Sequence, residues 1–212
     1  MSLLEAPSMV VELDGWRPVL LPMVPTGSAD EVVAELLVNL PESLAGRLRG
    51  LPLAEHPVVR EVRRLFRAAG CDPTRYRPSS EALARRLLKR QLLPSIHPLV
   101  DLNNLLSVRL LVPCCVMDGA AVQGPLVLRA GRAGERMESM RGAMSLEGKP
   151  VLADEKGPLG TPISDSTRVM VTSETSAVLM VVYLTASLHP TEAWRTELED
   201  LLERAPVATL GR

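Results

Sequence analysis

The chain changes its hydrophobic pattern near the middle, and this change restricts the folds that it can adopt. After two short strand-like runs, apolar residues recur at helical spacing up to residue 110, in segments bounded by proline and glycine. Beyond that point, short apolar runs alternate with clusters of Gly, Pro and Ser, as in strands joined by turns. Helices followed by strands predict an α+β fold, with a largely antiparallel or mixed sheet packed with helices.

The predicted elements form one domain. Helices are expected at residues 29–38, 42–49, 57–69, 99–110 and 190–205, with a further one from Ser79 or Ser80 to Leu93. Strands are expected at residues 10–13, 19–24, 126–129, 136–140, 151–154, 169–172 and 178–184. The 212 residues can bury one core. We expect N-terminal strands and a helix in residues 1–56, the core itself in 57–186, and a C-terminal helix and tail in 187–212.

Ten basic side chains gather in residues 60–90, beside only three acidic ones. This segment carries a local net charge of +7, whereas the whole chain carries −1 and the remainder therefore −8. A basic segment on an otherwise acidic protein indicates a surface that binds a polyanion. The alternative is a solvated helical face held by local ion pairs, for which Glu61, Asp72 and Glu81 are the available acids.

Composition and motifs disfavour several other classes of function. Only five aromatic residues occur, which disfavours a base-stacking platform for single-stranded nucleic acid. The three cysteines include an adjacent pair and no Cys-x-x-Cys motif, which indicates reduced thiols in the cytoplasm. The three histidines each precede proline and are spread along the chain, so we expect surface or helix-capping roles for them, no metal and no cofactor. No apolar segment is long enough to span a membrane, and we expect a cytoplasmic protein without a membrane partner.

An ordered set of motifs between residues 59 and 183 resembles one known family. The motifs are Arg67-x-x-Gly70-x-Asp72-Pro73, Arg77-Pro78-Ser79-Ser80-Glu81-Ala82-Leu83 with Arg85-Arg86, Leu99-Val100-Asp101-Leu102-Asn103-Asn104, Pro113 to Asp118, Gly157-Pro158-Leu159-Gly160, Asp165-Ser166-x-Arg168 and Val171-Thr172-x-x-Thr175. The set resembles the B3/B4 domain of the bacterial phenylalanyl-tRNA synthetase β subunit, and specifically its free-standing relatives. The resemblance implies a B3/B4-like fold and an editing module alone, not an aminoacylating synthetase.

In that family the domain hydrolyses a wrong amino acid from the 3′ end of tRNA. The resemblance therefore implies a trans-editing aminoacyl-tRNA deacylase whose partner is the acceptor end of tRNA. Together with the charge pattern, it assigns tRNA binding to the basic residues Arg60, Arg63, Arg64, Arg67, Arg77, Arg85, Arg86, Lys89 and Arg90. Two alternatives stay open. One is a non-catalytic tRNA-binding or RNA-binding module with a decayed pocket, and the other is a protein that binds a small molecule such as an amino acid.

The resemblance also implies the residues of the pocket. Asn103 and Asn104 match a Thr-Asn pair of the synthetase's pocket helix, Pro113 matches a pocket proline, and Gly160 with its neighbour Thr161 matches a glycine-rich wall. Two positions, Cys115 and Val181, depart from the family pattern.

Cys115 stands where the synthetase has a pocket histidine, and Val181 where it has a glutamate. Those two groups would recognise a tyrosine hydroxyl, so their loss points to a smaller or apolar amino acid. Because an aminoacyl ester is already activated, the protein mainly has to position it and stabilise the developing oxyanion. We expect Asn104 to supply one donor and backbone N–H groups around Gly160 to supply others.

Asn104 lies one turn after Asp101 and one turn before Ser107, so we expect the three side chains to share a cavity. The alternative for Asn104 is that it only ties its helix to a neighbouring loop. For Asp101 and Asp118 we favour helix capping or loop stitching over catalysis.

Overall fold

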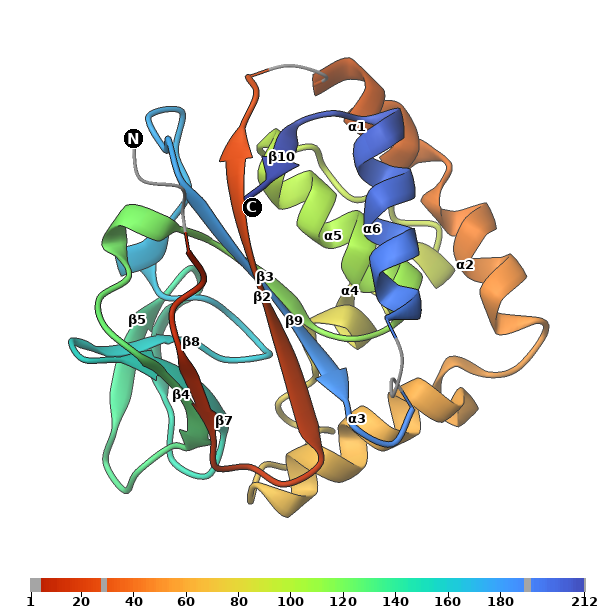
Figure 1. Cartoon of the computed structure of the whole chain (residues 1–212). Helices are drawn as coiled ribbons and strands as arrows, with labels where there is room; N and C mark the ends of the chain where they lie inside the picture. The colour runs from red at the N-terminus through yellow and green to blue at the C-terminus, as the bar shows by residue number, and fades with distance from the viewer. Residues whose placement is uncertain (1–4, 28–29, 189–191, 212) are drawn as a thin grey trace.

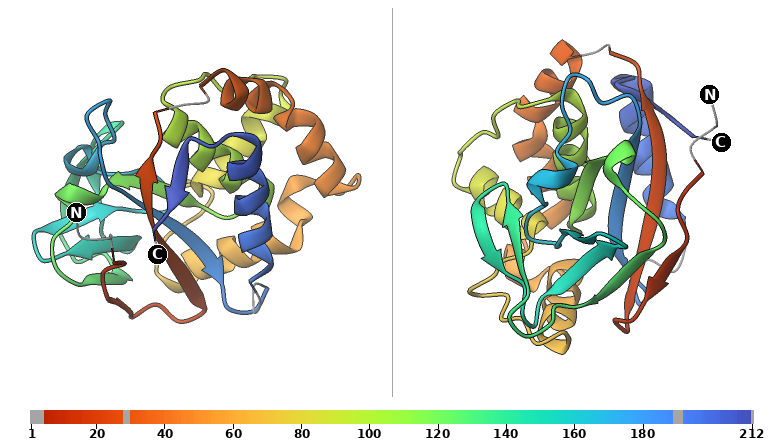
Figure 2. Two further views of the ribbon diagram at one scale, coloured as in Figure 1. Left: turned by 45° about the horizontal axis from the view of Figure 1, so that its top comes forward. Right: turned by 90° about the vertical axis from the view of Figure 1, so that its left-hand side faces the viewer.

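The computed structural model describes residues 5–27, 30–188 and 192–211. A central sheet divides the molecule: helices cover one of its sides, and a second, smaller sheet lies on the other (Figure 1). The two further views show the same division into layers (Figure 2). The α+β class and the largely antiparallel sheets are confirmed. No helix in the described ranges is long and apolar enough to cross a membrane.

The central sheet joins segments from both ends and the middle of the chain. Its strands are β2 (Trp16–Pro25), β3 (Cys114–Asp118), β9 (Val178–Thr185) and β10 (Ala208–Leu210). They lie in the order β10-β2-β9-β3, and every neighbouring pair is antiparallel. All eight residues of β9 are buried, which is why this strand reads as an uninterrupted apolar run.

The second sheet has the order β1-β4-β7-β8, with β1 parallel to β4 and the other pairs antiparallel. Its strands are β1 (Met9–Val11), β4 (Leu126–Ala130), β7 (Pro150–Asp154) and β8 (Gly157–Gly160). A separate hairpin consists of β5 (Arg136–Ser139) and β6 (Gly142–Ser145). A turn separates the two N-terminal strands, β1 and β2, which belong to different sheets.

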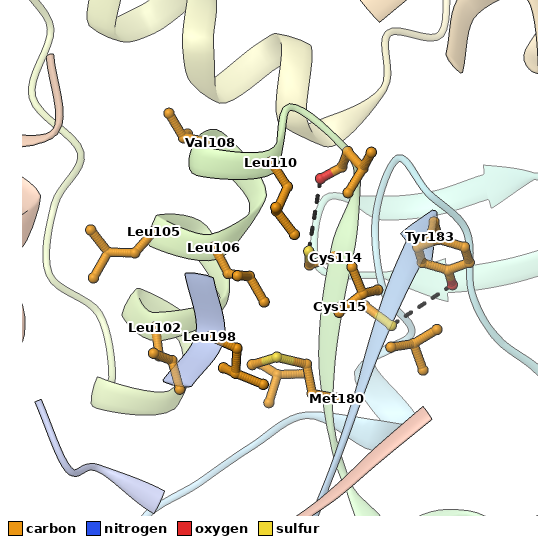
Figure 3. Close-up of a cluster of buried hydrophobic side chains, with 14 of the residues drawn as sticks. Leu102, Leu105, Leu106, Val108, Leu110, Cys114, Cys115, Met180, Tyr183 and Leu198 are labelled. Atoms are coloured by element: carbon orange, nitrogen blue, oxygen red, sulfur yellow. Dashed lines mark hydrogen bonds between the residues drawn. The ribbon is translucent and has the colours of Figure 1, made fainter. Parts of the chain in front are cut away.

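The helices pack around one that is buried on nearly every side. They are α1 (Asp30–Val38), α2 (Leu40–Leu48), α3 (Pro57–Ala68), α4 (Ser79–Leu88), α5 (Pro98–Leu110) and α6 (Ala193–Arg204), with 3-10 turns at Leu53–Glu55, Gly119–Ala121 and Thr167–Val169. The central one is α5, which touches α1, α2, α4, α6 and β3. Its side chains Leu102 and Leu106 meet Met180 of β9 and Leu198 of α6 in an aliphatic cluster (Figure 3).

Some predicted elements differ from the structure. The strand expected at 169–172 is wrong: a 3-10 turn forms at Thr167–Val169, where Ser166 caps the N–H of Arg168 and the Arg168 guanidinium binds Asp154 at 2.8 Å. The fourth helix ends at Leu88, before the predicted Leu93, because Arg90 adopts the left-handed conformation with φ 58°. The predicted helix starts at residues 29 and 190 lie outside the described residues.

Candidate functional site

A cavity of about 410 Å³ lies beside the edge strand β3. Its walls come from α4, from the loop before α5 and α5 itself, from β3, from the β5–β6 turn, and from the segment that follows β8. Most of the wall is apolar. The apolar lining residues are Ala82, Leu83, Leu93, Pro94, Ile96, Val100, Val116, Met140, Ile163, Met170 and Val171, and the polar ones are Ser79, Arg86, His97, Asn103, Asn104, Cys114, Arg141, Thr161, Ser164 and Asp165.

The two adjacent asparagines of α5 both line this cavity. Asn103 is buried, and its side-chain oxygen receives no hydrogen bond from the residues described in the structure. Asn104 is half-buried, and the described part of the chain gives its amide no hydrogen-bond partner either. An amide held at a cavity wall without a protein partner is suited to binding a ligand, since buried polar groups are normally paired. The structure thus brings together the two asparagines predicted for the pocket.

The expectation that Asp101, Asn104 and Ser107 share one cavity is wrong. Asp101 accepts hydrogen bonds from the Ser95 hydroxyl at 2.6 Å and the Ile96 N–H at 3.1 Å, which ties the preceding loop to α5. Ser107 donates to the Val112 carbonyl at 2.8 Å. Both side chains therefore make the local structural contacts that short polar groups in helices often make, and only Asn104 of the three faces the cavity.

Cys114, and not Cys115, lines the cavity. Successive residues of a strand point to opposite faces, so the two adjacent thiols cannot both reach it. The Cys115 sulfur lies 3.8 Å from the Tyr183 hydroxyl on the other face of the central sheet (Figure 3). The placement of Cys115 in the pocket, taken from the resemblance, is therefore corrected by one residue. Burial raises the pKa of the Cys115 thiol well above its usual range, which disfavours the nucleophilic thiolate.

We expect the Cys115→Ser variant to keep the deacylation activity implied by the resemblance within about threefold of the natural protein, since the Cys115 thiol does not line the cavity and burial raises its pKa. Initial rates and mass spectrometry of the protein during turnover check this, with Cys71→Ser as a second buried-thiol control. Complete loss of activity in a folded variant, or an acyl-thioester trapped on Cys115, would show that the thiol reacts.

The remaining predicted pocket residues lie behind the cavity wall or hold it in shape. Val181 is buried opposite Cys115 in the β3–β9 ladder, and the Pro113 carbonyl accepts the Tyr183 N–H at 3.0 Å; neither residue lines the cavity. Thr161 does line it, but its hydroxyl accepts the N–H groups of two residues in the next turn, each at 3.1 Å. Val181 thus lies in β9, one strand further into the sheet than β3, and Pro113 directly precedes β3.

Gly160 supports the wall without lining it. A β-carbon at this position would lie 2.9 Å from a carboxylate oxygen of Asp165, which is closer than such atoms normally approach. The absent side chain therefore lets the Asp165 carboxyl lie against the end of β8. Gly160 thus leaves space for the Asp165 carboxyl, a role different from the backbone N–H donor predicted for it from the sequence.

Asp165 is a cavity residue for which the sequence predicts no specific role. Its side chain is half-buried and lines the cavity, and loss of hydration raises its pKa to about 7. A carboxyl group that titrates near neutrality in a cavity is a candidate functional group. The sequence signal was its place in the Asp165-Ser166-x-Arg168 motif, but the burial that shifts its pKa depends on segments distant in sequence.

The predicted tRNA-binding residues differ in whether their charge is compensated by an ion pair. Four of them, Arg60, Arg63, Arg64 and Arg67, line a shallow groove along α3. Part of the charge is locally compensated, as the ion-pair alternative predicts: the buried carboxylate of Glu81 lies 3.0 Å from Arg63, 2.9 Å from Arg85 and 3.7 Å from Arg77, and Glu61 pairs with Arg64 at 2.8 Å. No described residue forms an ion pair with the exposed side chains of Arg60, Arg67, Arg86, Lys89 and Arg90.

We expect Arg63→Glu to lower the melting temperature by roughly 5–10 °C, because it places a second negative charge against the buried Glu81 carboxylate. Arg60→Glu, three residues earlier on the same helix and exposed, is the matched control and should shift the melting temperature by about 1 °C at most. Thermal unfolding of both variants tests this. Equal melting temperatures would mean that Arg77 and Arg85 alone neutralise Glu81.

The described residues contain no group of three histidine, cysteine or acidic side chains placed to hold a metal ion. His97, which lines the cavity, caps α5 by accepting the Leu99 N–H at its Nδ1 atom over 3.3 Å. This agrees with the predicted capping role of the histidines for the one that reaches the cavity. The chemistry of the cavity therefore depends on amides, one carboxyl group and an apolar wall.

Comparisons with known proteins identify a matching family and a similar fold. A family model described as B3/4 domain matches residues 61–197. The structure of an N-terminal fragment of the phenylalanyl-tRNA synthetase β subunit from Pyrococcus horikoshii is similar over 97% of this chain and 52% of that chain, with a TM-score of 0.50 and 14% sequence identity. The chain thus spans about half the length of that fragment, and at this identity the likeness concerns the fold. A comparison with curated proteins gives no match.

Proposed function

The chain belongs to the B3/4 domain family, and from this premise we propose that it is a hydrolase that removes wrongly attached amino acids from tRNA. The observation that carries the proposal is the cavity of about 410 Å³, in which an apolar wall surrounds the amide of Asn104 beside a basic surface. The structurally similar fragment is named as part of a tRNA synthetase, which makes tRNA the polyanion to test first.

The cavity suits the aminoacyl end of such a substrate. An apolar wall can hold an aliphatic side chain. Among the described residues no glutamate lines the cavity, and the histidine that does, His97, caps α5. We therefore propose that the amino acid removed is aliphatic. Asn104 would hydrogen-bond the ester or the oxyanion that forms when water attacks it, and the neighbouring ribose hydroxyl would help to orient that water.

The basic residues extend from the α3 groove to the cavity. Arg63 lines the groove and binds Glu81, and Glu81 also binds Arg85 of α4. The next residue, Arg86, is exposed and lines the cavity, so it lies at the cavity's edge. A tRNA acceptor stem lying along α3 and α4 would place its 3′ end near Arg86, with phosphates meeting arginines over the whole path.

The deciding experiment is deacylation of tRNAs charged with aliphatic, aromatic and small polar amino acids by the purified protein. Turnover of aliphatic esters that falls in the Asn104→Ala variant supports the proposal. Binding of tRNA that weakens with salt but gives no turnover with any ester would replace the hydrolase by a non-catalytic tRNA-binding module. Neither binding nor turnover would leave a protein that binds small molecules in the same cavity.

A further inference from the structure

The backbone on both sides of Asp165 is held firmly. Before it, the Thr161 N–H binds the Ser164 carbonyl at 3.0 Å; after it, the Ser166 N–H binds the Leu159 carbonyl at 2.9 Å. Its own carbonyl accepts the Met140 N–H at 3.1 Å, and its carboxyl lies against the Cα atom of Gly160. The position of this side chain in the cavity is therefore set by the fold and not by a partner of its own.

The carboxyl group of Asp165 has no hydrogen bond or ion pair with any residue of the described ranges. Removing such a group from water without a partner is costly, and proteins normally pair it. In the same cavity the side-chain oxygen of Asn103, a residue only 8% exposed, also receives no hydrogen bond. Two oxygen acceptors without donors in one apolar cavity call for a ligand that is positively charged and carries several N–H groups.

We propose that Asp165 binds the α-ammonium group of the aminoacyl moiety, with the side-chain oxygen of Asn103 as a second acceptor. The inference rests on the proposed function for the identity of the ligand and adds a requirement to it: the substrate must carry a free α-amino group. An ammonium group has three N–H donors and one positive charge, which matches two acceptors of which one is ionisable. A divalent cation would need further oxygen ligands, and among the described residues Asp165 is the only one that brings a carboxylate to the cavity.

Binding of this ammonium group has a consequence for protons. The carboxyl of Asp165 has a pKa of about 7, so at about pH 6 it is mostly protonated, whereas an α-ammonium group is still charged there. A cation beside the carboxyl favours its ionised form, so binding at that pH releases about one proton. The other titratable or charged side chains around Asp165 are Arg86, His97, Cys114 and Arg141 in the cavity, and Cys115 and Tyr183 behind it.

The test uses 3′-(aminoacylamino)-3′-deoxyadenosines as probes, in which a stable amide replaces the ester. Leucyl, valyl and alanyl probes are each compared with the same acyl group lacking the amine and with the N-acetylated form, by calorimetry with the full chain. We expect loss of the amine to weaken binding at least about tenfold, the usual effect of losing a hydrogen bond to a charged group. Titrations at about pH 6 in buffers of different ionisation enthalpy should show the released proton for the amine probes alone.

Asp165→Asn should reduce the preference for the amine to less than about threefold and abolish proton release, while Asp14→Asn, outside the cavity, should change neither. The experiments on the natural protein need no variant to fold. Equal affinity for probes with and without the amine, or failure of every probe to bind at about 1 mM, would overturn the proposal. So would an Asp165→Asn variant that keeps the preference but loses hydrolysis, since Asp165 would then act as a base.

Deacylation of the tRNA panel, measured separately, distinguishes the two proposals. Turnover without a preference for the free amine would retain the hydrolase and remove this role of Asp165. A preference for the free amine without turnover of any tRNA would retain the ammonium site and remove the hydrolase.

Discussion

Replacing Arg60, Arg67, Arg86 and Lys89 with glutamate is expected to weaken tRNA binding by at least about a thousandfold at moderate salt. Each of these exposed side chains would neutralise one phosphate and release a counterion, and reversal turns four attractive contacts into repulsive ones. Because none of the four forms an ion pair with a described residue, the melting temperature should change little. Filter binding or fluorescence anisotropy over a range of salt concentrations measures the effect, and the slope against salt should also become shallower.

The choice of residues for this variant follows from the structure. The sequence alone does not separate Arg63 from Arg60 or Arg67, but Arg63 binds the buried Glu81, so its reversal would confuse lost binding with lost folding. The matched control reverses four exposed basic residues outside α3 and α4 that form no ion pair with a described residue, namely Arg132, Arg136, Lys156 and Arg204, with the same change in net charge. If this control loses as much affinity, the effect is one of total charge, and α3 and α4 are not the contact surface.

Asn104→Ala is expected to lower the rate of deacylation by roughly a hundredfold, the usual effect of removing one donor to an oxyanion. Asn104 is half-buried, lines the cavity, and has no hydrogen-bond partner in the described chain, so its loss should cost little stability. Affinity for tRNA should also change little, because the proposed phosphate contacts lie on α3 and α4. Single-turnover rates with saturating protein separate the chemical step from binding.

Two further variants sharpen this test. Asn104→Leu keeps the shape of the side chain without its donor and should be as slow as the alanine variant, whereas Asn39→Ala, at the exposed cap of α2, should be fully active. A drop of several degrees in melting temperature with an unchanged rate per molecule would mean that Asn104 serves only to hold α5 in place. That outcome would leave Asn103 as the amide to examine next.

The helical half of the fold could be predicted from the sequence to within a few residues, because the amphipathic pattern and the prolines that begin helices are local signals. The end of α4 could not: Arg90 adopts a left-handed conformation usually taken by glycine, and no local signal marks it. β8 was missed as well, since Gly157–Gly160 contains two glycines and a proline and is a strand only through its pairing with β7.

The cavity residues on α5 could be predicted from the sequence, but those on β3 and on the loop after β8 could not. The motif Leu99–Asn104 indicated Asn103 and Asn104, whereas helical spacing wrongly grouped Asn104 with Asp101 and Ser107. To choose between Cys114 and Cys115, one has to know which face of β3 lines the cavity. A shift of one residue along a strand moves every side chain to the opposite face, and the sequence alone does not fix this register. Asp165 could not be singled out because its unusual pKa comes from burial by segments far away in the chain.

The segment that matches the family model does not include every strand of the central sheet, because β2, which pairs with β9, lies outside it. Residues 61–197 contain β9 and β3 but neither β2 nor β10. A fragment cut at these limits would expose the whole β9 edge that β2 covers from Trp16 to Met23, and such an edge recruits strands from other molecules. The segment that matches the family model therefore lacks a strand that the central sheet needs. A shortened protein for expression has to keep the strand that begins at Trp16.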